Sequence, residues 1–266
     1  MTDPVLVYGL LCLSAFAAGA VNSVAGGGTL LTFPALLHMF GRKTAELAGV
    51  WANATSTLAL MPGSLAGALA YRRELTEYRQ LVLMLIAPSM LGGAVGSLLV
   101  TEFPPAVFDR LIPWLILSAA FLFMIQGPVK RLTGTGAHSV PGWKTAVAVI
   151  VGQFLIAVYG GYFGAGIGIL MLAVLPFMGT KSIHETNAVK TILAGCINAV
   201  TVVVFAVKGV VQWEYALPMA AAAILGGYAG GHFARRLPAI YVRAIVIVIG
   251  LTLGGYYLWK QFGAGQ

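Results

Sequence analysis

The sequence predicts an all-α, polytopic membrane protein built from two related halves. It is 59% hydrophobic and only 9% charged, with a mean hydropathy of +0.90, whereas about 25% of the residues in an ordinary soluble domain are charged. The charges lie in short clusters between apolar runs of roughly twenty or more residues, long enough to cross a hydrocarbon core of about 30 Å. Three motifs also occur twice in the same order. A soluble protein with buried helices is a poor alternative for this composition.

The apolar runs fall into two sets. They cover residues 5–40, 44–70, 76–100 and 105–126 in the first set, and 142–179, 184–207, 214–232 and 239–259 in the second. The segment between the sets is polar and contains Gly, Pro, Lys and Arg, which is typical of a connecting loop. We therefore divide the chain into an N-terminal repeat, residues 1–126, a cytoplasmic linker, residues 127–141, and a C-terminal repeat, residues 142–266.

The repeated motifs relate the two halves residue by residue. Ala25-Gly26-Gly27-Gly28-Thr29-Leu30 recurs 140 residues later as Ala165-Gly166-Ile167-Gly168-Ile169-Leu170. At an offset of 134, Asn53-Ala54-Thr55-Ser56-Thr57 recurs as Asn187-Ala188-Val189-Lys190-Thr191, and Leu91-Gly92-Gly93 as Leu225-Gly226-Gly227. In so apolar a chain, an internal repeat is typical of a transporter whose site lies where the halves meet.

The first run of each half is too long for one helix across the membrane and is interrupted by glycines. Each glycine costs a helix about 1 kcal/mol relative to alanine, and Pro34 and Pro176 shorten or bend the helix after each interruption. Each run therefore crosses once as a broken helix or turns back as a hairpin. Single crossings divide the 16 Lys and Arg eight to eight between the faces, and hairpins divide them eleven to five. Only the hairpin model gives the expected excess of Lys and Arg on the cytoplasmic face. They leave three crossings per half, so the halves are inverted and both termini lie outside the cytoplasm.

The glycine breaks are candidate anion-binding positions. A broken helix at membrane depth lines a cavity or is buried in protein, and its free N-terminus presents N–H groups and a partial positive charge. We favour this role for Gly26, Gly27, Gly28, Gly164, Gly166 and Gly168. Close helix packing is the alternative, and we favour it for Gly92, Gly93, Gly226 and Gly227. Asn22, Ser23 and Thr29 flank the first break and Tyr162 the second. Contact with a ligand and capping of a helix end both stay open for Asn22 and Ser23.

The second motif places polar residues on one helical face. Asn53, Ser56 and Thr57 are spaced i, i+3 and i+4, and Asn187, Lys190 and Thr191 repeat the spacing. Lysine in a membrane helix costs about 2.5–3.5 kcal/mol on insertion scales and is a functional candidate. We favour attraction of an anion, with snorkelling to the cytoplasmic interface as the alternative. Because the first half has serine where Lys190 stands, the sequence predicts one site rather than two equal ones.

Other kinds of function find little support. The net charge of +8 is assigned to loops beside an anionic membrane surface and not to nucleic-acid binding. There is no nucleotide-binding loop, so ATP hydrolysis is not expected, and no metal or other cofactor is predicted. His184-Glu185 resembles the start of a zinc-protease motif, but residue 188 is alanine where the second histidine is required. Glu185 is better explained as a carboxylate at a helix start. No carboxylate lies at midspan as an obvious proton or sodium relay.

These residues resemble the sulfite exporter TauE/SafE family. The resemblance rests on Gly19-Ala20-Val21-Asn22-Ser23-Val24 with the adjoining glycine motif, on Gly160-Gly161-Tyr162-Phe163-Gly164-Ala165-Gly166-Ile167-Gly168, and on the Asn-Ala-x-x-Thr helices. It covers nearly the whole chain. It implies a multi-pass permease of the bacterial inner membrane that moves small sulfur-containing anions, such as sulfite or an organosulfonate like sulfoacetate. Ile167 in place of Gly27 and Tyr162 in place of Asn22 argue against a strictly two-fold site.

We therefore expect a secondary transporter that exports such an anion by alternating access. The anion would lie near the membrane midplane between the two glycine breaks, held by N–H groups, Asn and Thr side chains and Lys190. With the cytoplasm negative, moving one negative charge outward gains about 2.3 kcal/mol per 100 mV, so coupling to another ion is not required. A channel-like uniporter for small anions or other solutes is the main alternative, and import rather than export stays open. A membrane enzyme that uses His184 and Glu185 is a weaker alternative.

Overall fold

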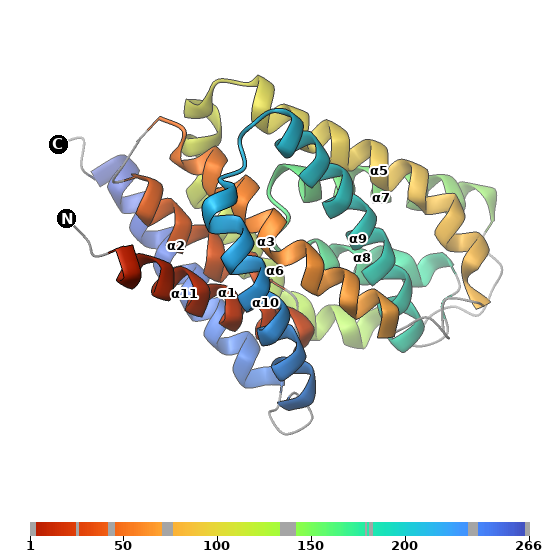
Figure 1. The fold of residues 1–266 in the computed structure, drawn as a ribbon. Coiled ribbons are helices and arrows are strands. Elements are labelled where there is room, and N and C mark those ends of the chain that lie inside the picture. Colours follow the sequence, from red (N-terminus) through yellow and green to blue (C-terminus); the bar gives the residue numbers. More distant parts are fainter. Residues whose placement is uncertain are drawn as a thin grey trace.

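The computed structural model describes residues 4–24, 27–41, 46–70, 77–133, 142–178, 180, 183–233 and 239–263. Within these residues every regular element is helical, which confirms the all-α prediction (Figure 1). Six of the described helices are long and apolar enough to cross a membrane, over Pro4–Asn22, Arg79–Glu102, Pro105–Ile125, Trp143–Tyr162, Glu185–Val207 and Ala244–Gly263. Two shorter apolar helical segments, Thr29–Gly41 and Ile167–Met178, come after the glycine breaks.

The helices of the first half follow the predicted apolar runs. They are α1 (Pro4–Val24), α2 (Thr29–Gly41), α3 (Ala48–Ala70), α5 (Arg79–Glu102) and α6 (Pro105–Thr133). Helix α6 continues beyond the apolar run into the segment that we assigned to the linker. Pro128 lies inside it. Proline removes one backbone hydrogen bond, but its φ is compatible with a helix. The helix therefore continues through Pro128, although the Gly, Pro and basic residues of this segment had predicted a loop.

The second half repeats this order. Its elements are α7 (Trp143–Tyr162), α8 (Ile167–Val174), the 3₁₀ turn η1 (Leu175–Met178), α9 (Ile183–Val207), α10 (Trp213–Phe233) and α11 (Ala239–Gly263). Helix α8 gives way to η1 just before Pro176, as expected for a residue that cannot donate to the helix. By sequence offset, α1 and α2 correspond to α7 and α8, α3 to α9, α5 to α10, and α6 to α11.

The first run of each half folds back on itself. A Cβ on Gly160 would lie 3.2 Å from Ile167, and one on Gly152 would lie 3.6 Å from Val174. The second pair lies farther from the break on both helices than the first pair, and both pairs are in contact. Helix α8 therefore runs antiparallel to α7. Helix α2 likewise returns along α1 (Figure 1), and a Cβ on Gly28 would lie 2.6 Å from the carbonyl oxygen of Ala18.

The two halves interlock instead of forming separate bodies. Helix α1 packs most extensively against α10 and α7 against α5, so each hairpin lies beside a helix of the other half, while α3 packs on α9 and α6 on α11. Glycines allow these close approaches. A Cβ on Gly92 would come within 2.5 Å of the carbonyl oxygen of Phe154, one on Gly93 within 3.2 Å of that of Ile197, and one on Gly226 would overlap that of Phe16. This confirms the packing role for these three, whereas Gly227 has ordinary room around it.

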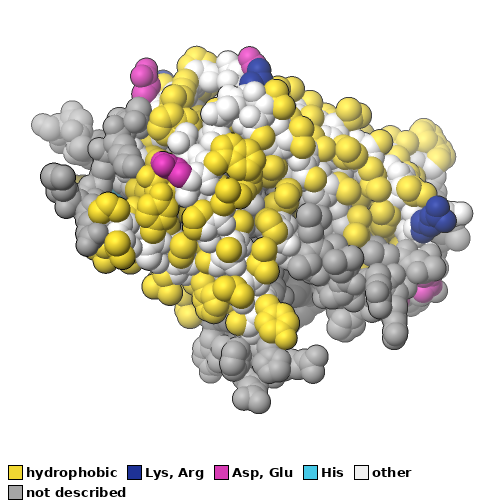
Figure 2. Space-filling view, viewed as in Figure 1, with side chains coloured by type: hydrophobic (Ala, Val, Ile, Leu, Met, Phe, Trp, Pro, Cys, Tyr) yellow, Lys and Arg dark blue, Asp and Glu magenta, His cyan; other side chains and the backbone are white. Residues whose placement is uncertain are grey.

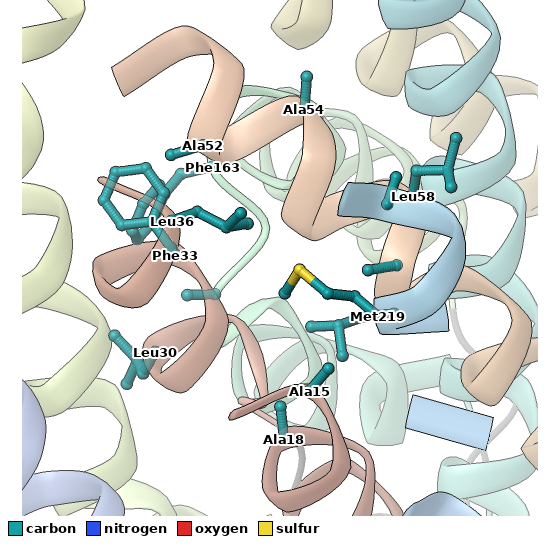
Figure 3. Close-up of a cluster of buried hydrophobic side chains, with 14 of the residues drawn as sticks. Ala15, Ala18, Leu30, Phe33, Leu36, Ala52, Ala54, Leu58, Phe163 and Met219 are labelled. Carbon is teal, nitrogen blue, oxygen red and sulfur yellow. The ribbon is translucent and has the colours of Figure 1, made fainter. Parts of the chain in front are cut away.

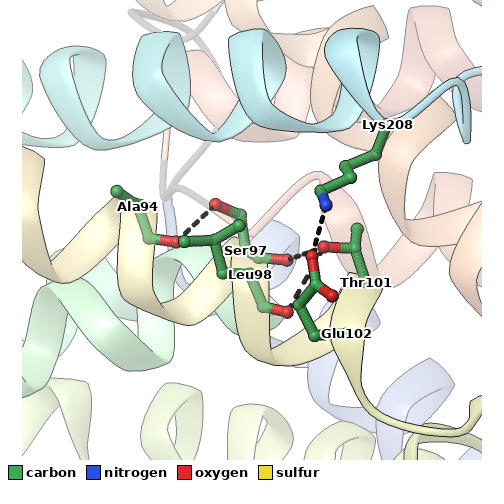
Figure 4. A network of polar contacts seen from close by, with 6 residues as sticks. All are labelled: Ala94, Ser97, Leu98, Thr101, Glu102 and Lys208. Atoms are coloured by element: carbon green, nitrogen blue, oxygen red, sulfur yellow. Dashed lines mark hydrogen bonds and ion pairs between the residues drawn. The ribbon is translucent and has the colours of Figure 1, made fainter.

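Helices α5 and α9 run in the same direction. At their starts, the hydroxyl of Tyr78 donates to Oε2 of Glu185 over 2.6 Å. At their ends, Glu102 forms an ion pair with Lys208 (Figure 4). Between these helices the chain passes through α6 and the α7–α8 pair. A single crossing by that pair would put the two starts on opposite membrane faces, so the contacts favour the hairpin arrangement.

Helix α3 lies in the interior. Its residues 52–56 and 58–60 are all buried, as expected for a helix surrounded by protein on every side. The buried cluster in Figure 3 joins Phe33 and Leu36 of α2 and Ala54 of α3 to Phe163 and Met219 of the second half. The outer surface is largely hydrophobic, and the charged side chains visible in Figure 2 lie mostly towards its rim. Such a surface is typical of a protein surrounded by lipid.

Candidate functional site

The first glycine break connects α1 to α2. Gly27 has φ of +91°, a conformation that glycine adopts without the cost paid by other residues. The N–H of Leu30 donates to the carbonyl of Gly27 over 3.0 Å and that of Leu31 to Gly28 over 2.9 Å, which starts α2. A Cβ on Gly27 would overlap the ring of Phe123. The first break is therefore covered closely by an aromatic side chain of α6.

The second break connects α7 to α8 and has a similar form. The N–H groups of Phe163 and Gly164 both bond to the carbonyl of Tyr159, which ends α7. Gly166, with φ of +83°, is the N-cap residue of α8, and its carbonyl accepts the N–H of Ile169 over 2.9 Å. The hydroxyl of Tyr159 donates to the carbonyl of Ala165 over 2.8 Å and holds the connection. The first N–H groups of α8 have no acceptor within their own helix.

Both breaks face the same part of α6. Phe123 covers Gly27, while Leu122 and Ala119 lie 3.2 and 3.8 Å from the Cβ position of Gly166. Neighbouring residues of one helix thus contact both breaks. The two sequence motifs, 140 residues apart, therefore pack against the same stretch of α6.

Helix α3 contributes polar groups to both hairpins. The side-chain amide of Asn53 donates to the carbonyl oxygen of Tyr162, the last residue of α7, over 2.9 Å. One turn later, the hydroxyls of Ser56 and Thr32 share a buried hydrogen bond of 2.6 Å, and Thr32 lies in α2. Asn53 therefore bonds to the α7–α8 hairpin and Ser56 to the α1–α2 hairpin, and both are predicted site residues of the first half. Asn53 reaches across to the second half, which sequence spacing did not reveal.

Lys190 of α9 lies beside the start of α8. Its Cδ and Nζ are 3.3 and 3.7 Å from the Cβ position of Gly168, which stands in the first turn of α8. The ammonium group therefore lies next to the positive end of a helix and close to the second break. The role of Lys190, attraction of an anion or snorkelling, stays a prediction. Three predicted residues, Gly166, Gly168 and Lys190, are brought together here.

The threonines of the repeated motif bond within their own helices. Thr57 donates to the carbonyl of Asn53 over 2.8 Å, and Thr191 donates to that of Asn187 over 2.7 Å. In this structure their hydroxyl protons are committed, so an anion meets a donor there only after the side chain rotates. Asn187, Thr29 and Asn22 are each half-buried. Ser23 lies at the end of α1 with its side chain outside the described set, and Gly26 is outside the described residues altogether.

An aromatic cluster adjoins the second break and was not predicted from the sequence. Phe33 contacts Phe163 edge-on at 5.2 Å between ring centroids and Phe108 at 6.4 Å, and Phe108 contacts Tyr162 at 5.4 Å. Phe33, Phe108 and Phe163 are each at most 2% exposed. Aromatic residues are so common in membrane helices that no sequence signal separates these from lipid-facing ones. They form an apolar wall between α2, α6 and the break.

The His184-Glu185 pair is described only in part. Glu185 lies in the first turn of α9 and accepts the Tyr78 hydroxyl, which agrees with its predicted role at a helix start. The side chain of His184 is outside the described set. Among the described residues, no group of three or more His, Cys, Asp or Glu side chains is placed to hold a metal ion.

Two broken hairpins enclosed by apolar spanning helices, with a lysine beside one helix start, are features of a multi-pass membrane transporter. Sequence comparison identifies the family. The chain belongs to the sulfite exporter TauE/SafE family, whose model matches residues 11–257, and the resemblance seen in the sequence is thereby confirmed.

Curated relatives align along nearly their whole length. A probable membrane transporter protein of Haemophilus influenzae is 26% identical over 253 residues, covering 95% of this chain and 94% of the relative. The probable membrane transporter protein ORF9 of Sinorhizobium sp. is 28% identical, with coverage of 91% and 89%. The probable membrane transporter protein YfcA of Escherichia coli K12 is 24% identical, with coverage of 99% and 93%. No solved structure matches the chain significantly. The chain is thus a bacterial-type, multi-pass membrane transporter.

Proposed function

We propose that this transporter exports a small sulfur-containing anion, sulfite or a small organosulfonate, by alternating access. The observation that carries the proposal is Lys190 beside the first turn of α8. A lysine ammonium and a helix N-terminus are both positive, so an anion that lies between them is attracted by both. The same arrangement of N–H groups and positive charge recurs wherever helix starts bind anions. The family description supplies the substrate class.

The anion is placed near the second break, where both halves contribute. Asn53 comes from the first half and Lys190 from the second, and each approaches the short connection between α7 and α8. A site formed across the interface of two halves changes its access when the halves move relative to each other. The proposed inversion of the repeats is supported by the parallel course of α5 and α9, whose contacts at both ends favour hairpins over single crossings.

Transport in proteoliposomes tests the proposal. Purified protein is reconstituted, and sulfite efflux is followed with an inside-negative membrane potential. We expect saturable efflux that grows with the potential, because one negative charge leaving gains about 2.3 kcal/mol per 100 mV. Lys190→Ala should lower efflux at least about tenfold, and Lys190→Arg should restore part of it, since the charge returns with different geometry. Lys208→Ala, which removes an exposed lysine away from the breaks, is the matched control.

Two outcomes would contradict the assignment. If neither Lys190→Ala nor Gly27→Leu changes sulfite flux, the site is elsewhere. If flux fails to saturate and unlabelled sulfite on the far side does not accelerate exchange, the protein is a channel-like uniporter instead. Reversing the potential and the gradient in the same vesicles decides between export and import. A His184→Ala, Glu185→Ala double variant that retains transport excludes chemistry by that pair.

A further inference from the structure

We propose that the transported anion moves along one polar face of α9, and that Asn198 and Thr201 of this face bind it on its way. The inference rests on the proposed function and deepens it, because it names a path and two binding residues that lie outside the repeated motifs. Three observations carry it: the spacing of polar residues along α9, the exposure of the face that they form, and a buried hydroxyl at its closed end.

The first observation is a line of mostly polar residues on one face of α9. Their spacing alternates between four and three residues, which keeps them on one side of a helix. The line consists of Asn187, Thr191, Ala194, Asn198, Thr201 and Phe205. The opposite side of α9 carries Cys196 and Val203, and Val203 is 61% exposed, as expected for an apolar residue that faces lipid. The polar face is therefore turned towards the protein, where α3 packs on α9.

The second observation is that this face is exposed at one end and closed at the other. The four residues of the line from Asn187 to Asn198 are each partly exposed, whereas Thr201 is 1% exposed and Phe205 is fully buried. A face turned away from lipid is exposed only where a space between helices admits water, and polar side chains at membrane depth need such water or a ligand. A water-filled path therefore enters where α9 begins and ends at Thr201.

The third observation is the buried hydroxyl at the closed end. The Oγ1 atom of Thr201 has no hydrogen-bond partner within the described structure. A threonine in a helix commonly donates to the carbonyl four residues earlier, as Thr191 does to Asn187 over 2.7 Å. An unpaired buried hydroxyl costs about 1–3 kcal/mol and is rare enough to need a specific explanation. Binding of the anion at this position supplies the missing acceptor.

These observations describe one state of a transport cycle. The amide of Asn198 and the hydroxyl of Thr201 lie about one turn apart on the same face, and both donate to the oxygens of a small oxyanion. One turn farther, Phe205 closes the path, because it belongs to the same buried cluster as Ala52 and Leu58 of α3. With α9 running outward from the cytoplasm, as in the hairpin arrangement, this state faces the cytoplasm. Export then requires Phe205 to separate from α3.

Cysteine reactivity in membrane vesicles tests the path. In a background without the two native cysteines, the Ala194→Cys, Asn198→Cys and Val203→Cys variants are treated with a charged, membrane-impermeant thiosulfonate reagent. The first two should react at least about tenfold faster than Val203→Cys, although Val203 is 61% exposed. The reason is that a thiol reacts as its thiolate, which forms in water but not in lipid. Equal or faster reaction of Val203→Cys would overturn the path.

The side of entry is tested with the same variants in spheroplasts and in inverted vesicles. Lys208 follows the end of α9 and is exposed, so Lys208→Cys reports which side that end faces. Asn198→Cys should react faster from the opposite side, because the path enters where α9 begins. Faster reaction from the Lys208 side would show that the closed end has been placed wrongly, and the inference would fall.

Transport and stability together test the binding role of Thr201. Thr201→Val keeps the shape of the side chain and removes a hydroxyl without a partner, so the thermal unfolding midpoint in detergent should stay or rise. Sulfite efflux from proteoliposomes should nevertheless fall at least about fivefold, and Asn198→Ala should lower it by a similar factor. Thr252→Val, at an exposed threonine of α11, is the matched control and should keep wild-type efflux.

The outcomes separate this inference from the proposed function. Unchanged efflux in Thr201→Val and Asn198→Ala would overturn the binding role, and so would a Thr201→Val variant that loses stability and transport together, because its hydroxyl would then have a structural partner. If no sulfur anion moves faster than through protein-free liposomes, the proposed function is wrong, whereas the cysteine reactivities still decide whether the path along α9 exists.

Discussion

The side-chain amide of Asn53 and the carbonyl of Tyr162 form a hydrogen bond of 2.9 Å between residues that are 109 positions apart. It joins the central helix of the first half to the end of α7 in the second half. A glycine-broken helix leaves carbonyl groups without partners at its end, and in lipid they cannot be satisfied by water. The amide of Asn53 supplies one such partner, so the second break depends on the first half for its shape.

The hairpin arrangement makes a prediction about membrane sidedness. Cys12 and Cys196 are free and are first replaced by alanine. We expect the Lys208→Cys variant to react with a membrane-impermeant maleimide in intact spheroplasts, and a Trp143→Cys variant, altered at an exposed position, to react only after permeabilisation. The reason is that α9 crosses the membrane between these two positions, whereas the α7–α8 hairpin returns to the face from which it started. Labelling of both positions from the same side would support single crossings instead.

Gly166→Ala should destabilise the protein through the backbone of the second break. At φ of +83° a residue with a Cβ costs about 1–2 kcal/mol, and here the Cβ would also lie 3.2 Å from Leu122. Gly209→Ala is the control, because Gly209 has φ of +67° but no atom within 4 Å of the Cβ position. We expect both variants to lower the thermal unfolding midpoint in detergent, and Gly166→Ala to lower it more. Equal shifts would mean that Leu122 adjusts at no cost.

Gly226→Ala should disturb the packing of α10 on α1. The added Cβ would overlap the main-chain carbonyl of Phe16, and backbone cannot move aside as a flexible side chain can. Gly255→Ala in α11 has nothing within 4 Å of its Cβ position and should be neutral or stabilising by up to about 1 kcal/mol. Comparing the thermal unfolding midpoints of the two variants separates the cost of the backbone overlap from the gain in helix propensity. A neutral Gly226→Ala would show that α1 and α10 do not pack in backbone contact at this position.

Gly27 and Phe123 should be energetically coupled. A Cβ on Gly27 would overlap the Phe123 ring, which is 1% exposed. Phe123→Ala leaves a cavity and should cost about 3–5 kcal/mol, and Gly27→Ala should be destabilising through both strain and overlap. In the double variant the methyl group occupies part of the cavity, so the effects should fall short of additivity by about 0.5–3 kcal/mol. Additive unfolding free energies in the double-mutant cycle would place Phe123 away from the break.

Part of the candidate site was predictable because its residue types are unusual in membrane helices. The glycine clusters and Lys190 are costly there, so their presence singles them out, and the structure places Gly166, Gly168 and Lys190 together. The roles of Phe123, Phe163 and Thr32 were not predictable. Each is an ordinary residue of an apolar helix, and only its position across from a break or from Ser56 gives it importance. The repeat also did not show that Asn53 reaches the second half rather than the first.

The sequence alone determined the membrane location, the helical class, the two repeats and the two breaks, because hydropathy, glycine content and motif spacing are local properties of the chain. The charge count also favoured hairpins over single crossings. The tertiary structure alone decided which elements meet. It brought both breaks against neighbouring residues of α6 and packed each hairpin against a helix of the other half. It also placed Asn53 and Lys190 at the two ends of the same break. These contacts depend on how interlocked helices satisfy buried backbone groups and fill space, and no local pattern encodes that.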